Sequence, residues 1–169
     1  MHSASPVQLA SCGVPGRENV NRFLGTLVLC FALAQGALAD LPDKADEIGK
    51  HLEFLGYTVQ PKDDRLIAKH PKYFNFYLKS FAGGILLTAY FTGSEYAKQH
   101  QGEFYALANE LNKGSAVARY YVDQDTDLII EAWYPGGYER VQFGVFIDGF
   151  NTVSKQVNGM MDKLRPFLE

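Results

Sequence analysis

Residues Tyr73–Phe91 read YFNFYLKSFAGGILLTAYF and predict a β-hairpin. Two runs of alternating character flank Gly83 and Gly84, a pattern typical of two strands joined by a two-residue turn. A turn at these two glycines predicts a register that places Tyr77 opposite Tyr90. One face of the hairpin is then apolar, whereas the other face is amphipathic and rich in aromatic rings.

A second hairpin is predicted further along the chain. Its strands are expected at Ala116–Val122 and Leu128–Tyr134, on either side of the acidic loop Asp123–Asp127. If Val122 lies opposite Leu128, the oppositely charged side chains of Arg119 and Glu131 lie opposite each other on the two strands. Such a cross-strand pair contributes only about 0.2–1 kcal/mol, but it supports the register.

Three segments show the 3.6-residue periodicity of amphipathic helices. The first carries Ile48, Leu52 and Leu55 and is expected to end at Gly56. The apolar positions of the other two segments are Phe104, Leu107, Ala108 and Leu111, and then Phe143, Phe146, Phe150, Val153, Val157, Met160, Met161 and Leu164. We therefore expect one helix before the first hairpin, one helix between the two hairpins and one long helix at the end.

Two short strands complete the expected order of elements. They lie at Tyr57–Gln60 and Leu66–Lys69, with a turn over Pro61–Asp64 between them. The order is then α-β-β-β-β-α-β-β-α. It predicts an α+β fold in which helices pack on one face of an antiparallel sheet.

The N-terminal region has the order of a secretory signal. Phe23–Ala34 is an uncharged apolar run, with Arg22 before it and the small-residue site Ala37–Ala39 after it. The run is shorter than the roughly 20 residues that span a bilayer, so a retained membrane anchor is the lesser alternative. We expect residues 1–39 to be a signal peptide with an over-long N-terminal lead, cleaved after Ala39. Residues 40–169 are expected to form a single domain.

Composition limits the function classes. The chain has 169 residues, 47% of them hydrophobic, and a formal net charge of −3. Removal of residues 1–39 leaves 14 basic and 18 acidic residues, a net charge of −4, and takes away both cysteines. An exported domain without thiols depends on an ordinary apolar core. The acidic balance argues against nucleic acid and anionic lipid as partners, and we expect a periplasmic or secreted protein without stable membrane insertion.

The segment Leu107–Pro135 carries a resemblance to a known family. It reads LANELNKGSAVARYYVDQDTDLIIEAWYP, in which a helix ends in an Asn-Glu-Leu-Asn box and a hairpin with an acidic turn follows. This segment resembles the YbjN domain family, described as candidate bacterial sensory-transduction regulators, and the element order extends the likeness over Asp43–Leu164. The resemblance implies a fold similar to type III secretion chaperones and a regulatory or chaperone-like role. It brings no catalytic residues with it.

The acidic loop invites comparison with a calcium site. Asp123, Asp125 and Asp127 are spaced as the first ligands of a calcium-binding loop. Leu128 and Tyr134, however, stand where such a loop needs glycine and glutamate. We therefore interpret the aspartates as a solvated turn and expect neither a metal nor another cofactor.

No catalytic motif is present in the sequence. His51, His70 and His100 have neither i, i+4 spacing nor a cysteine nearby, so we interpret them as surface histidines. No serine lies in a G-x-S-x-G motif. Glu131 and Asp148 are interpreted as solvated surface carboxylates, because these residue types are mostly exposed. We expect the protein not to be an enzyme.

The remaining candidate site is the aromatic face of the predicted sheet. Its residues are Tyr77, Tyr90, Arg119, Tyr121, Glu131 and Trp133. Tyrosine, tryptophan and arginine dominate binding hot spots, so an exposed face of this composition favours protein binding. In the alternative interpretation the face is a second core surface, covered by the last helix.

The sequence thus predicts an exported, non-catalytic module that binds a protein partner or a second copy of itself, with a homodimer expected. Two alternatives stay open. One is a hydrolase-type envelope enzyme with its site near the loop at Gly136 and Gly137. The other is a purely structural homo-oligomer.

Overall fold

Six strands form one antiparallel sheet in the computed structural model, which describes residues 41–169. The predicted signal peptide, its cleavage site and both cysteines lie outside these residues. The strands are β1 (Thr58–Lys62), β2 (Arg65–Lys69), β3 (Phe76–Phe81), β4 (Gly84–Phe91), β5 (Arg119–Val122) and β6 (Leu128–Pro135). Their order across the sheet is β1-β2-β3-β4-β6-β5, so β6 inserts between β4 and β5.

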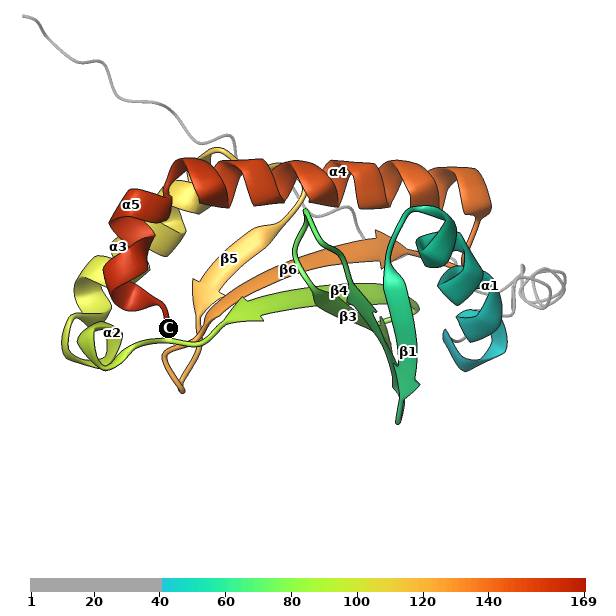
Figure 1. The fold of residues 1–169 in the computed structure, drawn as a ribbon, viewed down its shortest axis with the longest axis horizontal. Helices are drawn as coiled ribbons and strands as arrows, with labels where there is room; N and C mark the ends of the chain where they lie inside the picture. Colours follow the sequence, from blue (N-terminus) through green and yellow to red (C-terminus); the bar gives the residue numbers. More distant parts are fainter. Residues whose placement is uncertain (1–40) are drawn as a thin grey trace, which may run out of the picture. The chain divides into compact units, whose positions relative to one another are not determined.

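Helices pack on one face of this sheet. They are α1 (Leu41–Phe54), α2 (Glu95–Gln99), α3 (Gln101–Lys113), α4 (Arg140–Gly159) and α5 (Met161–Leu164), with a final 3₁₀ turn at Arg165–Phe167. Figure 1 shows α4 running across the sheet, with α1 next to β1 at one end and α2, α3 and α5 grouped at the other. The prediction of an α+β fold with a one-sided helical layer is confirmed.

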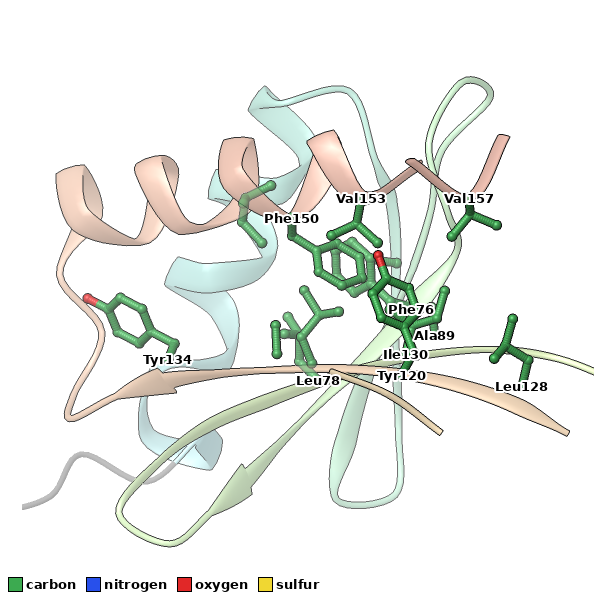
Figure 2. Close-up of a cluster of buried hydrophobic side chains, with 14 of the residues drawn as sticks. Phe76, Leu78, Ala89, Tyr120, Leu128, Ile130, Tyr134, Phe150, Val153 and Val157 are labelled. Carbon is green, nitrogen blue, oxygen red and sulfur yellow. The ribbon is translucent and has the colours of Figure 1, made fainter. Parts of the chain in front are cut away.

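The core lies between α4 and the sheet. Phe150, Val153 and Val157 of α4 point down onto side chains of the strands, among them Leu78 and Ile130 (Figure 2). All five side chains are almost completely buried. Burial of apolar surface on this scale is the main favourable contribution to folding, at about 25 cal/mol per Å² removed from water.

The turn of the first hairpin lies one residue earlier than expected, because its central residues are not Gly83 and Gly84 but Ala82 and Gly83. Both have positive φ angles, 48° and 73°, as a tight hairpin turn requires. Tyr77 therefore lies opposite Thr88, and not opposite Tyr90. The predicted register is wrong by two residues, but a shift of two leaves every side chain on its predicted face.

Glycine is needed at position 84 of β4 because its neighbours leave no room for a side chain. A Cβ atom at this position would lie 2.3 Å from the carbonyl oxygen of Tyr134 and 2.6 Å from Nε1 of Trp133. The second glycine of the pair thus serves the packing of β4 against β6. It does not serve the turn.

The second hairpin has the predicted register. Val122 lies opposite Leu128, and Arg119 lies opposite Glu131. The strand β5 nevertheless begins at Arg119 instead of Ala116. The cause is a turn in which the hydroxyl of Ser115 accepts a hydrogen bond from the N–H of Ala118 and donates one to its carbonyl, at 3.1 and 2.8 Å.

Other boundaries also differ from the expected ones. The strand β1 extends to Lys62, which reduces the predicted four-residue turn to Asp63 and Asp64. The long terminal helix is interrupted at Met160, and α5 follows it. Within residues 41–169, no helix combines the length and apolar character needed to cross a membrane.

Candidate functional site

One face of the sheet carries no helix from residues 41–169, and we call it the open face (Figure 1). The strand registers place all six predicted site residues on it, together with Lys79, Phe81, Leu86, Thr88 and Ile129. Tyr90 is 59% exposed, Trp133 48% and Tyr121 37%. The alternative that a helix covers these rings as a second core surface is therefore wrong for the described residues.

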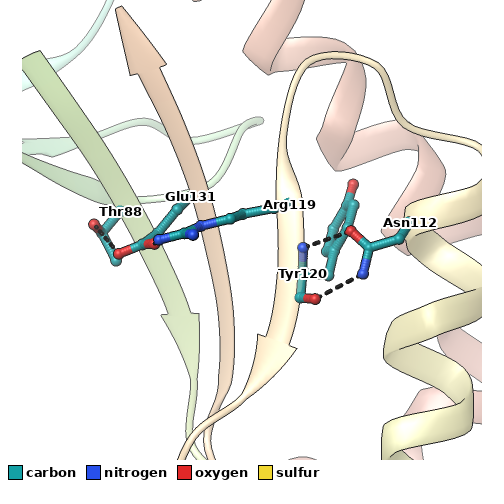
Figure 3. Close-up of polar contacts among 5 residues, drawn as sticks. All are labelled: Thr88, Asn112, Arg119, Tyr120 and Glu131. Atoms are coloured by element: carbon teal, nitrogen blue, oxygen red, sulfur yellow. Dashed lines mark hydrogen bonds and ion pairs between the residues drawn. The ribbon is translucent and has the colours of Figure 1, made fainter. Parts of the chain in front are cut away.

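Glu131 is the centre of a hydrogen-bond network on the open face (Figure 3). Its Oε2 atom accepts hydrogen bonds from Nε of Arg119 at 3.0 Å and from Nη2 of the same guanidinium. Its Oε1 atom accepts a hydrogen bond of 3.5 Å from the hydroxyl of Thr88. The residue is only 8% exposed, so its interpretation as a solvated carboxylate is wrong. Because a buried charge needs a partner, this network fixes β5, β6 and β4 against one another.

The network also shifts the pKa values of two neighbouring side chains. Hydrogen bonds to Glu131 raise the pKa of Arg119, and burial together with the charge of Glu131 raises the pKa of Tyr121. The guanidinium carbon of Arg119 lies 5.5 Å from the centre of the Tyr121 ring, within cation–π range. At neutral pH the face therefore presents a charged guanidinium, which donates hydrogen bonds to Glu131, and a protonated phenol, which is able to donate one.

Trp133 forms one wall of a depression on the open face. Its Nε1–H donates a hydrogen bond of 3.0 Å to the carbonyl oxygen of Phe81, which holds the indole across the β3–β4 turn. The depression has a volume of about 420 Å³, and its lining includes Leu86, Val117 and Arg119. Mostly apolar walls, with the paired charges of Arg119 and Glu131 among them, suit an apolar side chain of a partner.

Leu86 and Thr88 are not among the six predicted site residues, although the alternation in the first hairpin places both on the same face. Both are buried on the open face, beneath the longer side chains of their neighbours. The sequence does place both in the second strand of the first hairpin. Their contact with Trp133 and Glu131 arises from the pairing of β4 with β6, which are far apart in the chain.

The acidic loop is a hydrogen-bonded turn. Asp123 accepts hydrogen bonds from the N–H groups of Asp125 and Asp127, and Asp127 accepts one from the N–H of Gly93 at 2.9 Å. The aspartates thus fasten the β5–β6 loop to the segment after β4. Among residues 41–169, no group of three or more His, Cys, Asp or Glu side chains is placed to hold a metal ion.

The loop at Gly136 and Gly137 contacts a buried histidine. The prediction of a surface histidine is wrong for His51, because α1 packs its ring against Phe143 of α4 and Nδ1 lies 3.0 Å from the hydroxyl of Tyr138. The carboxylate of Glu139 accepts hydrogen bonds from the first N–H groups of α4, and these lower its pKa. Both polar groups near the loop thus have structural partners, since one joins two helices and the other caps one.

Comparison with protein-family models and with curated protein sequences finds no match. Among solved structures, the chain is similar to YbjN from E. coli, described as a candidate transcription regulator. The identity is 18% and the TM-score 0.55, over 74% of this chain and 95% of that chain. It is also similar to an uncharacterised protein from Methanothermobacter thermautotrophicus, with 13% identity and a TM-score of 0.50, over 71% of this chain and 97% of that one. The chain therefore has a YbjN-like fold, as the resemblance implies.

Proposed function

We propose that the domain is a non-catalytic module that binds a protein through its open face. The observation that carries this proposal is the contrast between the two faces of the sheet. Helices bury most of one face, whereas the other exposes Tyr90, Tyr121 and Trp133 and holds an apolar depression beside Trp133. Large aromatic side chains near an arginine are typical of binding hot spots, and their exposure costs free energy that a partner would recover.

The Glu131 network supports this role because it makes the face rigid before binding. Arg119 is held by Glu131 of β6, and its guanidinium lies over the ring of Tyr121, so little side-chain freedom is lost when a partner docks. The YbjN-like fold supports a regulatory role, since YbjN itself is described as a candidate regulator. The proposed role needs no reacting group.

Substitution on the open face tests the proposal. Tyr90→Glu places a charge on the face, whereas Tyr105→Glu places the same charge at a tyrosine of α3 that is similarly exposed. Both variants and the parent chain are isolated by a tag from cross-linked producing cells. We expect a bound protein, or a second copy of the chain, that is lost only from Tyr90→Glu. Equal loss from both variants, or from neither, rejects the open face as the binding surface.

Export is the second part of the proposal. It is supported by the apolar run before Ala39 and by the lack of cysteine in residues 40–169. The intact mass of the chain recovered from the producing cells tests it. A chain that begins at Asp40 and is found in the periplasm or the medium is expected, whereas an uncleaved chain retained in the cytoplasm contradicts export.

A further inference from the structure

The strand registers align Trp133 with three cationic residues. Trp133 of β6 lies opposite Leu86 of β4, which lies opposite Lys79 of β3. Lys79 in turn lies opposite Arg65 of β2, and Arg65 lies opposite Lys62 of β1. One row across the open face therefore begins with the indole of Trp133 beside the depression and ends with three consecutive cations. We call these three residues, Lys79, Arg65 and Lys62, the cation row.

Neighbouring carboxylates do not neutralise the cation row. Within the described residues, no carboxylate lies within 4 Å of the ammonium group of Lys62 or Lys79. The guanidinium of Arg65 has one exposed partner, Asp64, at 3.4 Å. Like charges on adjacent strands repel, so the row is unfavourable in the isolated domain. A bound anion would relieve this repulsion.

The row is also unusual for this chain. Residues 41–169 contain 14 lysines and arginines but 17 aspartates and glutamates. The acidic residues lie mainly on helices and loops, and Glu131, the acidic residue of the open face, is neutralised by Arg119. Positive charge is thus concentrated on the surface that also exposes the aromatic rings.

The positive charges and the shape of the depression indicate which kind of partner fits the open face. Two copies docked with their open faces together would bring two cation rows against each other, which disfavours a symmetric dimer of that kind. Single-stranded nucleic acid binds chiefly by stacking on exposed ring faces. Here the depression is lined by the aliphatic side chains of Leu86 and Val117 as well as by the Phe81 and Trp133 rings, and the indole is held by its hydrogen bond to the carbonyl of Phe81. An apolar side chain suits this depression better than a nucleobase does.

We propose that the open face binds an acidic polypeptide segment with one apolar anchor residue, an inference that rests on the binding role assigned above. The anchor fills the depression beside Trp133, and carboxylates of the same segment lie over Lys79, Arg65 and Lys62. Neighbouring strands are about 4.8 Å apart, so the row extends from about 10 to about 19 Å from the strand of Trp133. An extended chain advances about 3.3 Å per residue, which places the carboxylates about three to six residues from the anchor.

Selection from a displayed library of random twelve-residue peptides on the immobilised full chain tests this spacing. We expect enriched peptides to carry Asp or Glu about three to six residues from an aromatic or aliphatic residue. The emission of Trp133, the chain's single tryptophan, then follows the binding of an enriched peptide in solution. The double variant Arg65→Gln, Lys79→Gln should bind this peptide about tenfold more weakly. The control variant Lys50→Gln, Lys113→Gln removes two helix lysines and should bind it as the parent does.

Four results would overturn the inference. Three of them are enriched peptides without an excess of acidic residues, equal affinity of the two double variants, and tighter binding of a twelve-residue oligothymidylate than of any peptide. The fourth is a dimer that forms through the open face and blocks peptide binding, because the partner is then a second copy of the chain. If Tyr90→Glu still loses its partner while no acidic preference is found, the binding role stands and the acidic chemistry fails.

Discussion

The side-chain amide of Asn112 pairs with the backbone of Tyr120 as a neighbouring strand would. Nδ2 donates a hydrogen bond of 2.7 Å to the carbonyl oxygen of Tyr120, and the N–H of Tyr120 donates one of 2.9 Å to Oδ1 (Figure 3). The strand β5 is one edge of the sheet, and an unpaired edge invites association with other chains. The last asparagine of the Asn-Glu-Leu-Asn box thus closes part of this edge.

Asn112→Ala removes both hydrogen bonds and leaves the backbone groups of Tyr120 to water. We expect the free energy of unfolding to fall by about 1–2 kcal/mol, because each bond contributes about 1 kcal/mol. Urea unfolding measures this loss. Asn109→Ala, on the exposed face of the same helix, is the matched control and should change little. Equal stability of the two variants would show that Asn112 does not secure the edge.

Gly84→Ala should disturb the position of Trp133. The new methyl group would overlap the carbonyl of Tyr134 and the indole nitrogen, so we expect a loss of about 1–3 kcal/mol together with a changed tryptophan emission. Gly102→Ala adds a methyl group in α3 where no atom lies within 4 Å. That variant should gain about 0.5–1 kcal/mol, because alanine favours helix. A stable Gly84→Ala with unchanged emission would contradict the packing described for β4 and β6.

Lys79→Gln should make the isolated domain more stable. It removes the repulsion between Lys79 and Arg65, which is worth about 0.2–1 kcal/mol between adjacent strands. The gain should shrink as salt is raised, since salt screens the repulsion. Thermal unfolding at low and high salt measures both effects, with Lys50→Gln on α1 as the comparison. A loss of stability that is independent of salt would mean that Lys79 contributes to packing instead.

His51 predicts a pH dependence of stability. Burial, and then the charge of Arg140, lower the pKa of this histidine from its ordinary value of 6.5. The unfolded chain therefore takes up the proton more readily than the folded one when the pH falls below 6.5. The stabilisation by neutral His51 is complete above that pH and is lost as the pH falls through the folded-state pKa.

Urea unfolding between pH 8 and pH 5 checks this dependence. His51→Gln should lose part of the decline in unfolding free energy with acidification, whereas His100→Gln should keep it. The amide side chain of the first variant can still form a hydrogen bond with Tyr138, which limits any loss of fold. A decline of the same size in the parent and in His51→Gln would assign the pH dependence to other groups.

Local sequence patterns were sufficient for the fold class but not for every turn. The alternation in Tyr73–Phe91 predicted the strands and their faces correctly. It could not distinguish a turn glycine from a packing glycine, because the need for glycine at position 84 arises from Tyr134 and Trp133 on another strand. The prediction of a surface histidine at position 51 is wrong for a similar reason, since the helix α4, whose Phe143 packs against its ring, lies far along the chain.

In the candidate site, too, contacts within one hairpin were predictable from the sequence, whereas contacts between hairpins were not. The Arg119–Glu131 pair lies within one hairpin, so its register was predictable from the sequence. The alignment of Trp133 with the cation row was not, because it requires the order of five strands and the insertion of β6 beside β4. The burial of Glu131 likewise depends on Thr88, which belongs to the other hairpin.

Site-specific photo-crosslinking tests the binding role of the open face most directly. A benzophenone amino acid replaces Tyr90 in one variant and Tyr105 in another, and the producing cells are irradiated. We predict a discrete product of higher mass from position 90 and none from position 105. No product from position 90, or the same product from both positions, would contradict the claim that this face of the sheet holds a partner.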